Sequence, residues 1–394
     1  MTRLWDNGAP LDARVLAYTA GDDYVLDERL VPYDVRASLA HARMLHSQNL
    51  LSEADLAAIT AGLNDLARAH ANGEWRIELA DEDGQSALET HLTQKIGAAG
   101  ARIHLGRSRN DQVLTALRLY LRDATRELAA AARRVASALD ELGAREHGTV
   151  LPGSTHMQQA MPSSVPLWAG GFAAEIRDDA DNLEGVLRRL GRNPLGSAAG
   201  YGTPGLPLDR DATTQDLEFD STQTPVTAAQ LSRGKAEAHL LFEITLLMLD
   251  LGRFAADVLL FYTQEFGFVA LPEAFTTGSS IMPQKRNPDV FELLRGRTAT
   301  AHAALDEALG IFAKLPSGYQ RDLQLLKAPL FRGIDLATQT LDLLPAAIAA
   351  MSFKPQNIEL DPSIHAAEQA YAMVVSEGIP FREAYRRVAA KLKG

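Results

Sequence analysis

Apolar residues recur at helical spacing along most of this chain. From Ser108 onward they step by three and four positions as far as Leu142, which predicts about nine turns of one helix. Ser108 followed three residues later by Asp111 resembles a capping box, so this helix is expected to begin within the sequence RSRND.

Two further long helices follow. The stretch from about 235 to 265 is apolar nearly all round, as expected of a helix shielded on every side within a bundle. Another helix is predicted to start at Asn287 as its N-cap, with Pro288 at the first helical position. Helices this long favour an extended bundle, and packing against identical subunits would cover its apolar surface.

Three Gly- and Pro-rich breaks interrupt the helices, at 151–164, 193–207 and 276–289. The predicted fold class is all-α, a long-helix bundle with smaller helical parts at both ends. The predicted domains are an N-terminal helical domain (1–105), a central long-helix bundle (106–352) and a short C-terminal helical part (353–394).

Composition and charge narrow the possible functions. Apolar residues make up 46 % of the 394 positions and aromatic residues 6 %, which favours packed helices over sheets. The formal charge of −11 argues against a nucleic-acid partner. The absence of cysteine excludes disulfides and thiolate chemistry. Neither a secretory signal in residues 1–15 nor a membrane-spanning run is visible, so a cytoplasmic protein without a membrane partner is expected.

Familiar cofactor and metal motifs are not supported. Gly200, Gly202 and Gly205 match G-x-G-x-x-G, but no strand precedes them and Pro204 interrupts the turn, so a dinucleotide site is not expected. No metal is expected either, since the histidines show no H-E-x-x-H spacing.

Polar residues concentrate at the helix start and in two of the breaks. The donors suited to carboxylates, together with a titratable histidine and a serine, are Ser108, Arg109, Asn110, Thr155, His156, Ser279, Ser280, Lys285 and Asn287. A helix N-terminus at Arg109 favours an anion. Together these residues indicate acid–base chemistry on a dicarboxylate. Taken alone, Arg109, His156, Lys285, Ser279 and Ser280 are compatible with ordinary surface or linker roles. Only the coincidence of three such segments in one chain favours function.

The sequence GSSIMPQKRNP, beginning at Gly278, closely resembles the signature of the fumarase/aspartase superfamily. Other stretches are similar to the argininosuccinate lyase family within it, among them HLGRSRNDQV, THMQQAMP and FTTGSSIMPQK. The resemblance implies reversible elimination of argininosuccinate to arginine and fumarate by general acid–base catalysis, without metal or cofactor. It also implies a homotetramer whose active sites are shared between subunits.

The same resemblance assigns roles to residues. Ser279 would remove the proton beside the carboxylate, His156 with Glu292 would assist protonation of the leaving nitrogen, and Lys285 would stabilise the carboxylate as charge develops. The implied substrate contacts are Thr19, Asp23, Ser108, Arg109, Asn110, Thr155, Asn287, Tyr319, Gln324 and Lys327.

Several positions depart from the family pattern, mostly where the leaving group would bind. They are Gly84, Gln85, Leu88, Ser154, Gly234, Leu325 and Leu326. Gly234 stands where a substrate-binding arginine is expected, and the adjacent Arg233 is a candidate replacement. Two alternatives therefore stay open: another carbon–nitrogen lyase acting on a different N-substituted aspartate or succinate, and a non-enzymatic, crystallin-like use of the fold.

Overall fold

The computed structural model describes residues 12–392. Residues 1–11, which hold most of the N-terminal segment inspected for a signal, and residues 393–394 lie outside the described part. The chain divides into two compact units. The first unit comprises Met1–Glu127, Asn182–Ile244 and Ala301–Asp335, and the second comprises Leu128–Asp181, Thr245–Thr300 and Leu336–Gly394. The domain boundaries at 105 and 352 stay a prediction.

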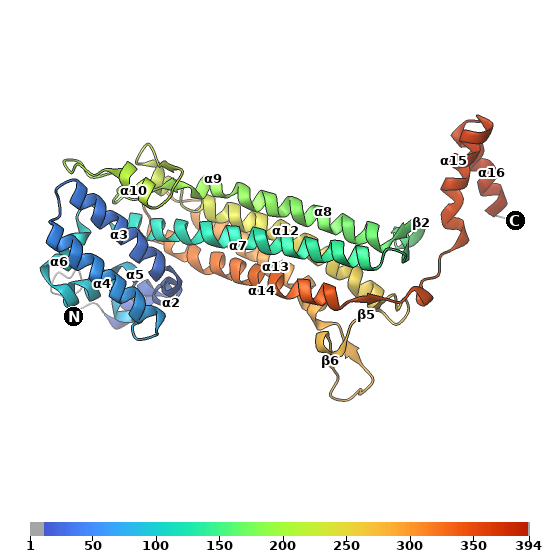
Figure 1. The fold of residues 1–394 in the computed structure, drawn as a ribbon, viewed down its shortest axis with the longest axis horizontal. Coiled ribbons are helices and arrows are strands. Elements are labelled where there is room, and N and C mark those ends of the chain that lie inside the picture. The colour runs from blue at the N-terminus through green and yellow to red at the C-terminus, as the bar shows by residue number, and fades with distance from the viewer. Residues whose placement is uncertain (1–11, 393–394) are drawn as a thin grey trace. The chain divides into compact units, whose positions relative to one another are not determined.

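Five long helices contribute residues to both units (Figure 1). They are α7 (Arg109–Arg145), α8 (Val165–Gly185), α12 (Lys235–Tyr262), α13 (Asp289–Phe312) and α14 (Lys327–Ala350). The predicted start of α7 is confirmed within one residue, and the Ser108 N–H donates to Asp111 Oδ1 at 2.9 Å. Helix α12 ends three residues before the expected 265.

The predicted cap of the third helix is wrong by one residue. Helix α13 starts at Asp289, and the Pro288 carbonyl accepts the first bonds, from Phe291 N at 3.0 Å and Glu292 N at 3.2 Å. Asn287 lies instead in a short strand. A sequence motif of Asn before Pro fits a cap, but cross-strand pairing with Thr277 holds this asparagine in extended backbone.

The first unit also contains shorter helices. These are α1 (Ala13–Ala20), α2 (Asp23–Leu26), α3 (Val31–Ser47), α4 (Glu53–Ala71), α5 (Gly84–Ile96), α6 (Ala98–Ala101), α9 (Leu187–Leu190), α10 (Arg210–Asp216) and α11 (Ala228–Leu231). Leu45, Leu63 and Leu92 are fully buried where α3, α4 and α5 meet. One short parallel pair, β3 (Arg192–Asn193) with β4 (Ser221–Thr222), lies beside α10.

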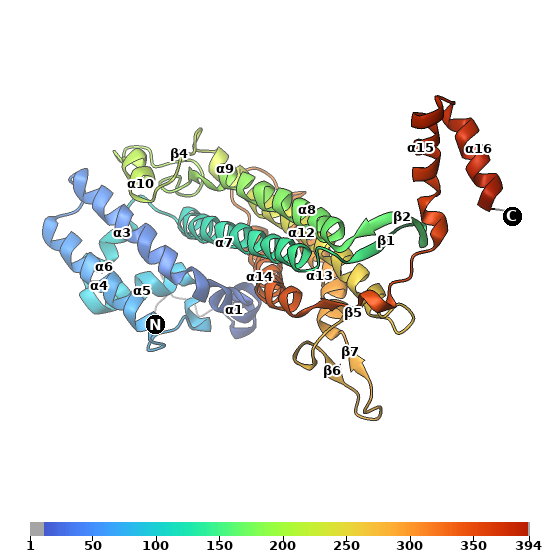
Figure 2. The same ribbon diagram turned by 45° about the vertical axis from the view of Figure 1, so that its right-hand side comes forward.

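In the second unit, segments of the long helices lie side by side (Figure 2). Aromatic side chains pack between α8 and α12. Trp168 of α8 packs against Phe254 and Phe261 of α12, and its Nε1–H donates to Asp257 Oδ2 at 2.9 Å. This contact satisfies the one polar atom of an otherwise apolar cluster.

Short strands of the second unit occur where the sequence breaks its helices. They form the antiparallel pairs β1 (Val150–Thr155) with β2 (Gln158–Ser164), β5 (Val269–Ala270) with β8 (Ser352–Phe353), and β6 (Thr277–Gly278) with β7 (Arg286–Asn287). The helices α15 (Ala366–Glu377) and α16 (Phe381–Leu392) complete this unit. None of the helices in residues 12–392 is long and apolar enough to cross a membrane.

Candidate active site

A polar cavity lies in the first unit, with about 500 Å³ of empty space that is partly open to solvent. Its lining residues come from segments far apart in sequence: Asp23, Asp83, Gln85, Arg109, Asn110, Val113, Arg233, Tyr319, Arg321, Gln324 and Lys327. Six of them were expected from the sequence as substrate contacts. Arg233 was expected as a candidate replacement for a missing arginine, and Gln85 only as a departure from the family pattern.

Lys327 is held between two buried carboxylates at the inner end of this cavity. Its Nζ lies 2.6 Å from Asp27 Oδ1 and 2.9 Å from Asp23 Oδ1, and it is 2 % exposed. Burial lowers the pKa of Lys327, but Asp27 and Asp23 outweigh it and leave this pKa above its ordinary value. The ammonium is therefore a fixed positive charge at neutral pH.

Burial also raises the pKa of Asp23 to about 7, with help from Asp27 and against the attraction of Lys327. Asp27 is additionally fixed by Gly84, whose N–H donates to Asp27 Oδ2 at 3.0 Å. Gly84 is thus a packing position as well as a departure from the family pattern, because an added Cβ there would lie 3.1 Å from Asp27 Cβ.

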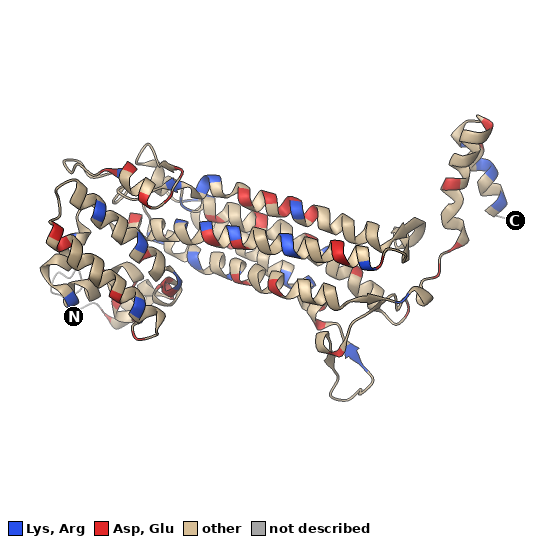
Figure 3. Ribbon diagram, viewed as in Figure 1, with Lys and Arg blue, Asp and Glu red and all other residues tan. Residues whose placement is uncertain are grey.

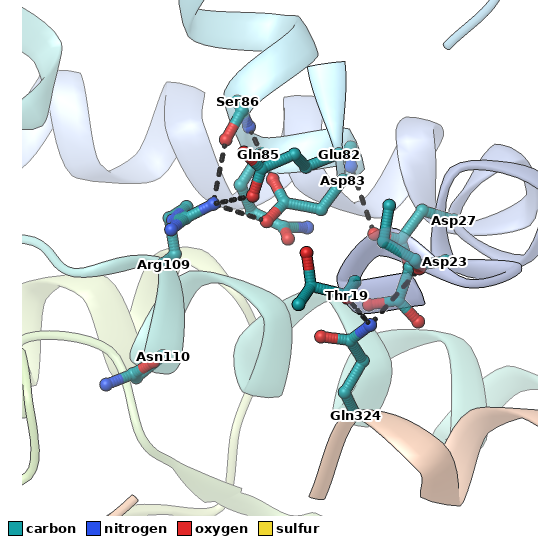
Figure 4. A network of polar contacts seen from close by, with 12 residues as sticks. Thr19, Asp23, Asp27, Glu82, Asp83, Gln85, Ser86, Arg109, Asn110 and Gln324 are labelled. Atoms are coloured by element: carbon teal, nitrogen blue, oxygen red, sulfur yellow. Dashed lines mark hydrogen bonds and ion pairs between the residues drawn. The ribbon is translucent and has the colours of Figure 1, made fainter. Parts of the chain in front are cut away.

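Arg109 lies on the other side of the network drawn in Figure 4. Its Nη1 donates to Asp83 Oδ2 at 2.9 Å and to Ser86 Oγ at 3.2 Å, and it lies 3.8 Å from Glu82 Oε2. Arg321 shares Glu82 at 3.8 Å and donates to the Thr19 carbonyl at 2.8 Å. Thr19 therefore takes part through its backbone, and Gln324 Nε2 donates to the same carbonyl at 3.0 Å.

The start of α7 is anchored by a single carboxylate. Asp111 Oδ2 accepts the N–H groups of Gly196 and Ala198 at 2.9 Å and 2.8 Å, while Oδ1 accepts that of Ser108. Burial raises the pKa of Asp111 to about 6, although these bonds oppose the shift. Asp111 thereby fixes the backbone that presents Arg109 and Asn110 to the cavity.

Arg233 occupies the cavity in place of the arginine that the family pattern expects one residue later. It is 3 % exposed, and its Nε and Nη1 have no hydrogen-bond partner among the described residues. Its guanidinium lies 5.3 Å from the ring centre of Tyr319. A buried cation with free donors is suited to a carboxylate ligand.

The position of Gly234 does not accommodate an arginine side chain. Its φ is +84°, in the left-handed region, and an added Cβ would lie 2.4 Å from Phe312 Cγ. Of the neighbouring departures, Leu325 is exposed and Leu326 is buried. The structure gives no account of why they replace acidic residues.

The remaining predicted residues belong to the second unit. Thr155 ends β1, and His156 and Met157 form the turn of the β1–β2 hairpin with φ of 53° and 61°. His156 is exposed. Glu292 lies in the first turn of α13 and is also exposed. No hydrogen bond or ion pair joins His156 to Glu292 within the described chain.

Ser279 lies directly after β6, in the loop that β6 and β7 close. Its Oγ accepts the N–H of Met282 at 3.1 Å and, less well placed, that of Ile281 at 3.4 Å. Asn287 Nδ2 donates to Thr277 Oγ1 at 3.3 Å at the base of the loop, and Lys285 is exposed. Two N–H groups directed at one hydroxyl oxygen stabilise negative charge on it.

Within the described residues, no group of three or more His, Asp or Glu side chains is arranged as metal ligands. Sequence reasoning did not select Asp27, Asp83 or Arg321. A weak signal existed for Asp83, since the acidic run DED directly precedes α5 and Asp83 caps that helix by accepting from Ser86 N at 2.8 Å. Asp27 and Arg321 lie in the stretches DERLVPYDV and YQRDLQ, which resemble the family, but no role was expected for either residue.

Fold and site together define an enzyme that handles a charged small molecule. The family model described as Lyase matches residues 12–302, and the chain belongs to this lyase family. Within it, the chain is 47 % identical over 392 residues to the argininosuccinate lyase of Sorangium cellulosum, covering 99 % of this chain and 90 % of that one. It is 42 % identical over 389 residues to the argininosuccinate lyase of Xylella fastidiosa strain Temecula1, covering 98 % and 87 %. The expected resemblance to carbon–nitrogen lyases of this kind is confirmed.

Solved structures agree on the fold. EDDS lyase in complex with formate has a TM-score of 0.81 at 24 % identity, covering 97 % of this chain and 76 % of that one. The class II fumarase of Schistosoma mansoni has a TM-score of 0.79 at 17 % identity, covering 98 % and 91 %. The predicted all-α, long-helix fold is confirmed.

Proposed function

We propose that this chain catalyses the reversible elimination of argininosuccinate to arginine and fumarate. The observation that carries the proposal is the cavity of the first unit, which presents both cations and carboxylates. Arg109, Arg233 and Lys327 suit the carboxylates of such a substrate, and Asp23 and Asp83 suit its guanidinium. A substrate that carries both charges matches this mixed lining, and the argininosuccinate lyases among the relatives support the choice.

In the proposed reaction, Ser279 Oγ takes the proton from the carbon beside a carboxylate. The N–H groups of Met282 and Ile281 support this role, because they stabilise the alkoxide that a serine base requires. Lys285 and Asn287 hold the carboxylate as negative charge develops on it. The carbon–nitrogen bond then breaks, and His156, with Glu292, supplies the proton to the departing nitrogen.

The proposal includes a homotetramer in the cytoplasm, with active sites shared between subunits. The separate location of the residues within one chain agrees with sharing: Thr155 and His156 lie at one hairpin, and Ser279, Lys285 and Asn287 at another. Ser108, Arg109, Asn110, Thr19, Tyr319 and Gln324 belong to the first unit and would bind substrate there.

The test is ultraviolet detection of fumarate released by the purified protein. Argininosuccinate, aspartate, adenylosuccinate and malate are supplied in parallel, and release from argininosuccinate alone is expected. Ser279→Ala and His156→Asn are expected to abolish release while helicity and assembly stay unchanged. Release from another substrate only would favour the alternative lyase, and full activity of Ser279→Ala would overturn the proposed mechanism.

A further inference from the structure

A second cavity in the first unit is lined by basic residues and by no acidic side chain. It has about 680 Å³ of empty space, partly open to solvent. Its lining comprises Arg118, Arg189, Arg192, Gln223, Ala228, Leu231, Ser232, Lys235 and Ala236. None of these residues lines the candidate active site.

Arg118 of α7 forms the buried floor of this cavity. It is 2 % exposed, and it donates to the Arg192 carbonyl, Gln223 Oε1 and Ser232 Oγ, while its Nε has no partner among the described residues. Burial lowers the pKa of Arg118 to about 10, yet that leaves it charged at neutral pH. Its position is fixed by three acceptors, so it is a rigid positive charge.

Only one carboxylate compensates this group. Glu237 attracts Arg118, whereas Arg233 and Arg192 repel it. Glu237 is itself 2 % exposed, and neither of its oxygens accepts a hydrogen bond within the described chain. The charges of Arg118 and Glu237 therefore offset each other. The positive charges of Arg189, Arg192 and Lys235 remain as the net charge of the lining.

Three exposed cations are left without an acidic partner. Within residues 12–392, the side chains of Arg189, Arg192 and Lys235 make no ion pair. Most surface arginines of this chain do pair, as Arg43 does with Asp216 and Arg177 with Asp140. In a protein of net charge −11, three unpaired cations around one cavity are a local reversal of sign. The ribbon of Figure 3 shows blue on α9, which carries Arg189. Such a cavity attracts a multiply charged anion.

We propose that this cavity binds a phosphoryl group of a small molecule. The guanidinium groups of Arg189 and Arg192 and the ammonium of Lys235 are suited to donate several hydrogen bonds to the oxygens of a tetrahedral phosphate dianion. Arg118, whose charge Glu237 offsets, is held beneath them by three acceptors and fixes the shape of the cavity. Gln223 and Ser232, already engaged by Arg118, shape the wall.

The site adjoins the candidate active site along the chain. Ser232 lines the phosphoryl cavity, and the next residue, Arg233, lines the active-site cavity. Gly234, whose backbone is left-handed, and Lys235 follow. Residues 232–235 therefore connect the two cavities. Binding does not require the proposed lyase reaction, and it is measured without it.

The test is isothermal titration of the purified full-length protein with inorganic phosphate and pyrophosphate. Saturable binding is expected for both, with pyrophosphate tighter. The double variant Arg189→Ala/Arg192→Ala is expected to weaken binding at least about tenfold, as loss of charge-assisted bonds predicts. The matched control is Arg188→Ala, which removes an exposed arginine of α9 outside the cavity and is expected to leave affinity unchanged.

Three outcomes would overturn the proposal. They are absence of saturable binding to the unmodified protein, equal affinity of the double variant, and equal loss in Arg188→Ala. Citrate serves as a second probe, and tighter binding of citrate than of pyrophosphate would reassign the cavity to carboxylates. Size-exclusion chromatography with light scattering accompanies each variant. A changed assembly with unchanged phosphate affinity would assign these cations to contact with a second copy instead.

Discussion

At the scale of single residues, the candidate site is built from charges that neutralise one another while buried. Lys327 with Asp23 and Asp27 is the clearest case, because all three are less than a tenth exposed. Taking such ions out of water costs free energy that only their mutual contacts return. Removing one partner therefore leaves the other two charges buried without the contacts that offset their loss of hydration.

Lys327→Met is expected to lower the free energy of unfolding by about 3–5 kcal/mol, the range found when a buried pair is broken. The matched control is Lys314→Met, which removes an exposed lysine of the same unit. Urea unfolding of both variants measures the difference. A loss no larger than that of the control would show that the two carboxylates are not held by this ammonium.

Asp34 gives a pH dependence whose sign follows from its burial. Burial raises the pKa of Asp34 to about 7, against the bond donated by Gln85 Nε2. The folded protein then holds a proton that the unfolded chain releases above its ordinary pKa of 3.8. The stabilisation is present below that value and is lost as pH rises toward 7.

Asp34→Asn is therefore expected to flatten the fall in unfolding free energy across this window, by up to about 1.4 kcal/mol per pH unit. Urea titrations at intervals of about one pH unit measure the slope. Asp65→Asn is the control, since Lys95 and Arg68 lower the pKa of that partly exposed carboxyl. An Asp34→Asn protein with the unmodified slope would contradict the assignment.

At the scale of elements, the periodicity of apolar residues predicted α7 and α12 well because each helix buries a continuous stripe. The caps were less certain: Asn287 fits an N-cap by composition, yet strand pairing with Thr277 holds it outside the helix. The hairpins were not predicted: β6 and β7 have two residues each, and the longer β1 and β2 show no regular alternation of buried and exposed positions. Asp27 and Arg321 were missed because their partners lie far along the chain.

At the junction of α11 and α12, the backbone conformation determines that Arg233, and not residue 234, supplies the arginine of the cavity. Gly234→Arg restores the residue that the family pattern expects, but it is expected to cost at least about 2 kcal/mol of stability through left-handed backbone and overpacking against Phe312. Fumarate release is not expected to improve. Gly185→Arg is the control, as nothing lies within 4 Å of an added Cβ there. Faster release by a Gly234→Arg protein as stable as the control would refute this account.

At the scale of the whole molecule, the proposed sharing of active sites predicts complementation between inactive variants. When Ser279→Ala and His156→Asn proteins are dissociated, mixed in equal amounts and reassembled, about a quarter of the sites would receive both intact residues from different subunits. Fumarate release measures the recovery. Each variant treated alone is the control, and no recovery in a correctly assembled mixture would place both residues of a site on one chain.

The buried triad of Lys327, Asp23 and Asp27 also limits how this sequence can change over time. A substitution at one of the three positions leaves the charges of the others unpaired. Variants of this sequence with a single substitution in the triad are therefore less stable than the sequence itself. A neutral, well-packed set of three could be equally stable, but it is reached only when the positions change together. Because Lys327 lies 300 residues from Asp27, recombination that exchanges only one end of the gene would separate them. A chimera with a parent that lacks the triad inherits a buried charge without its partner.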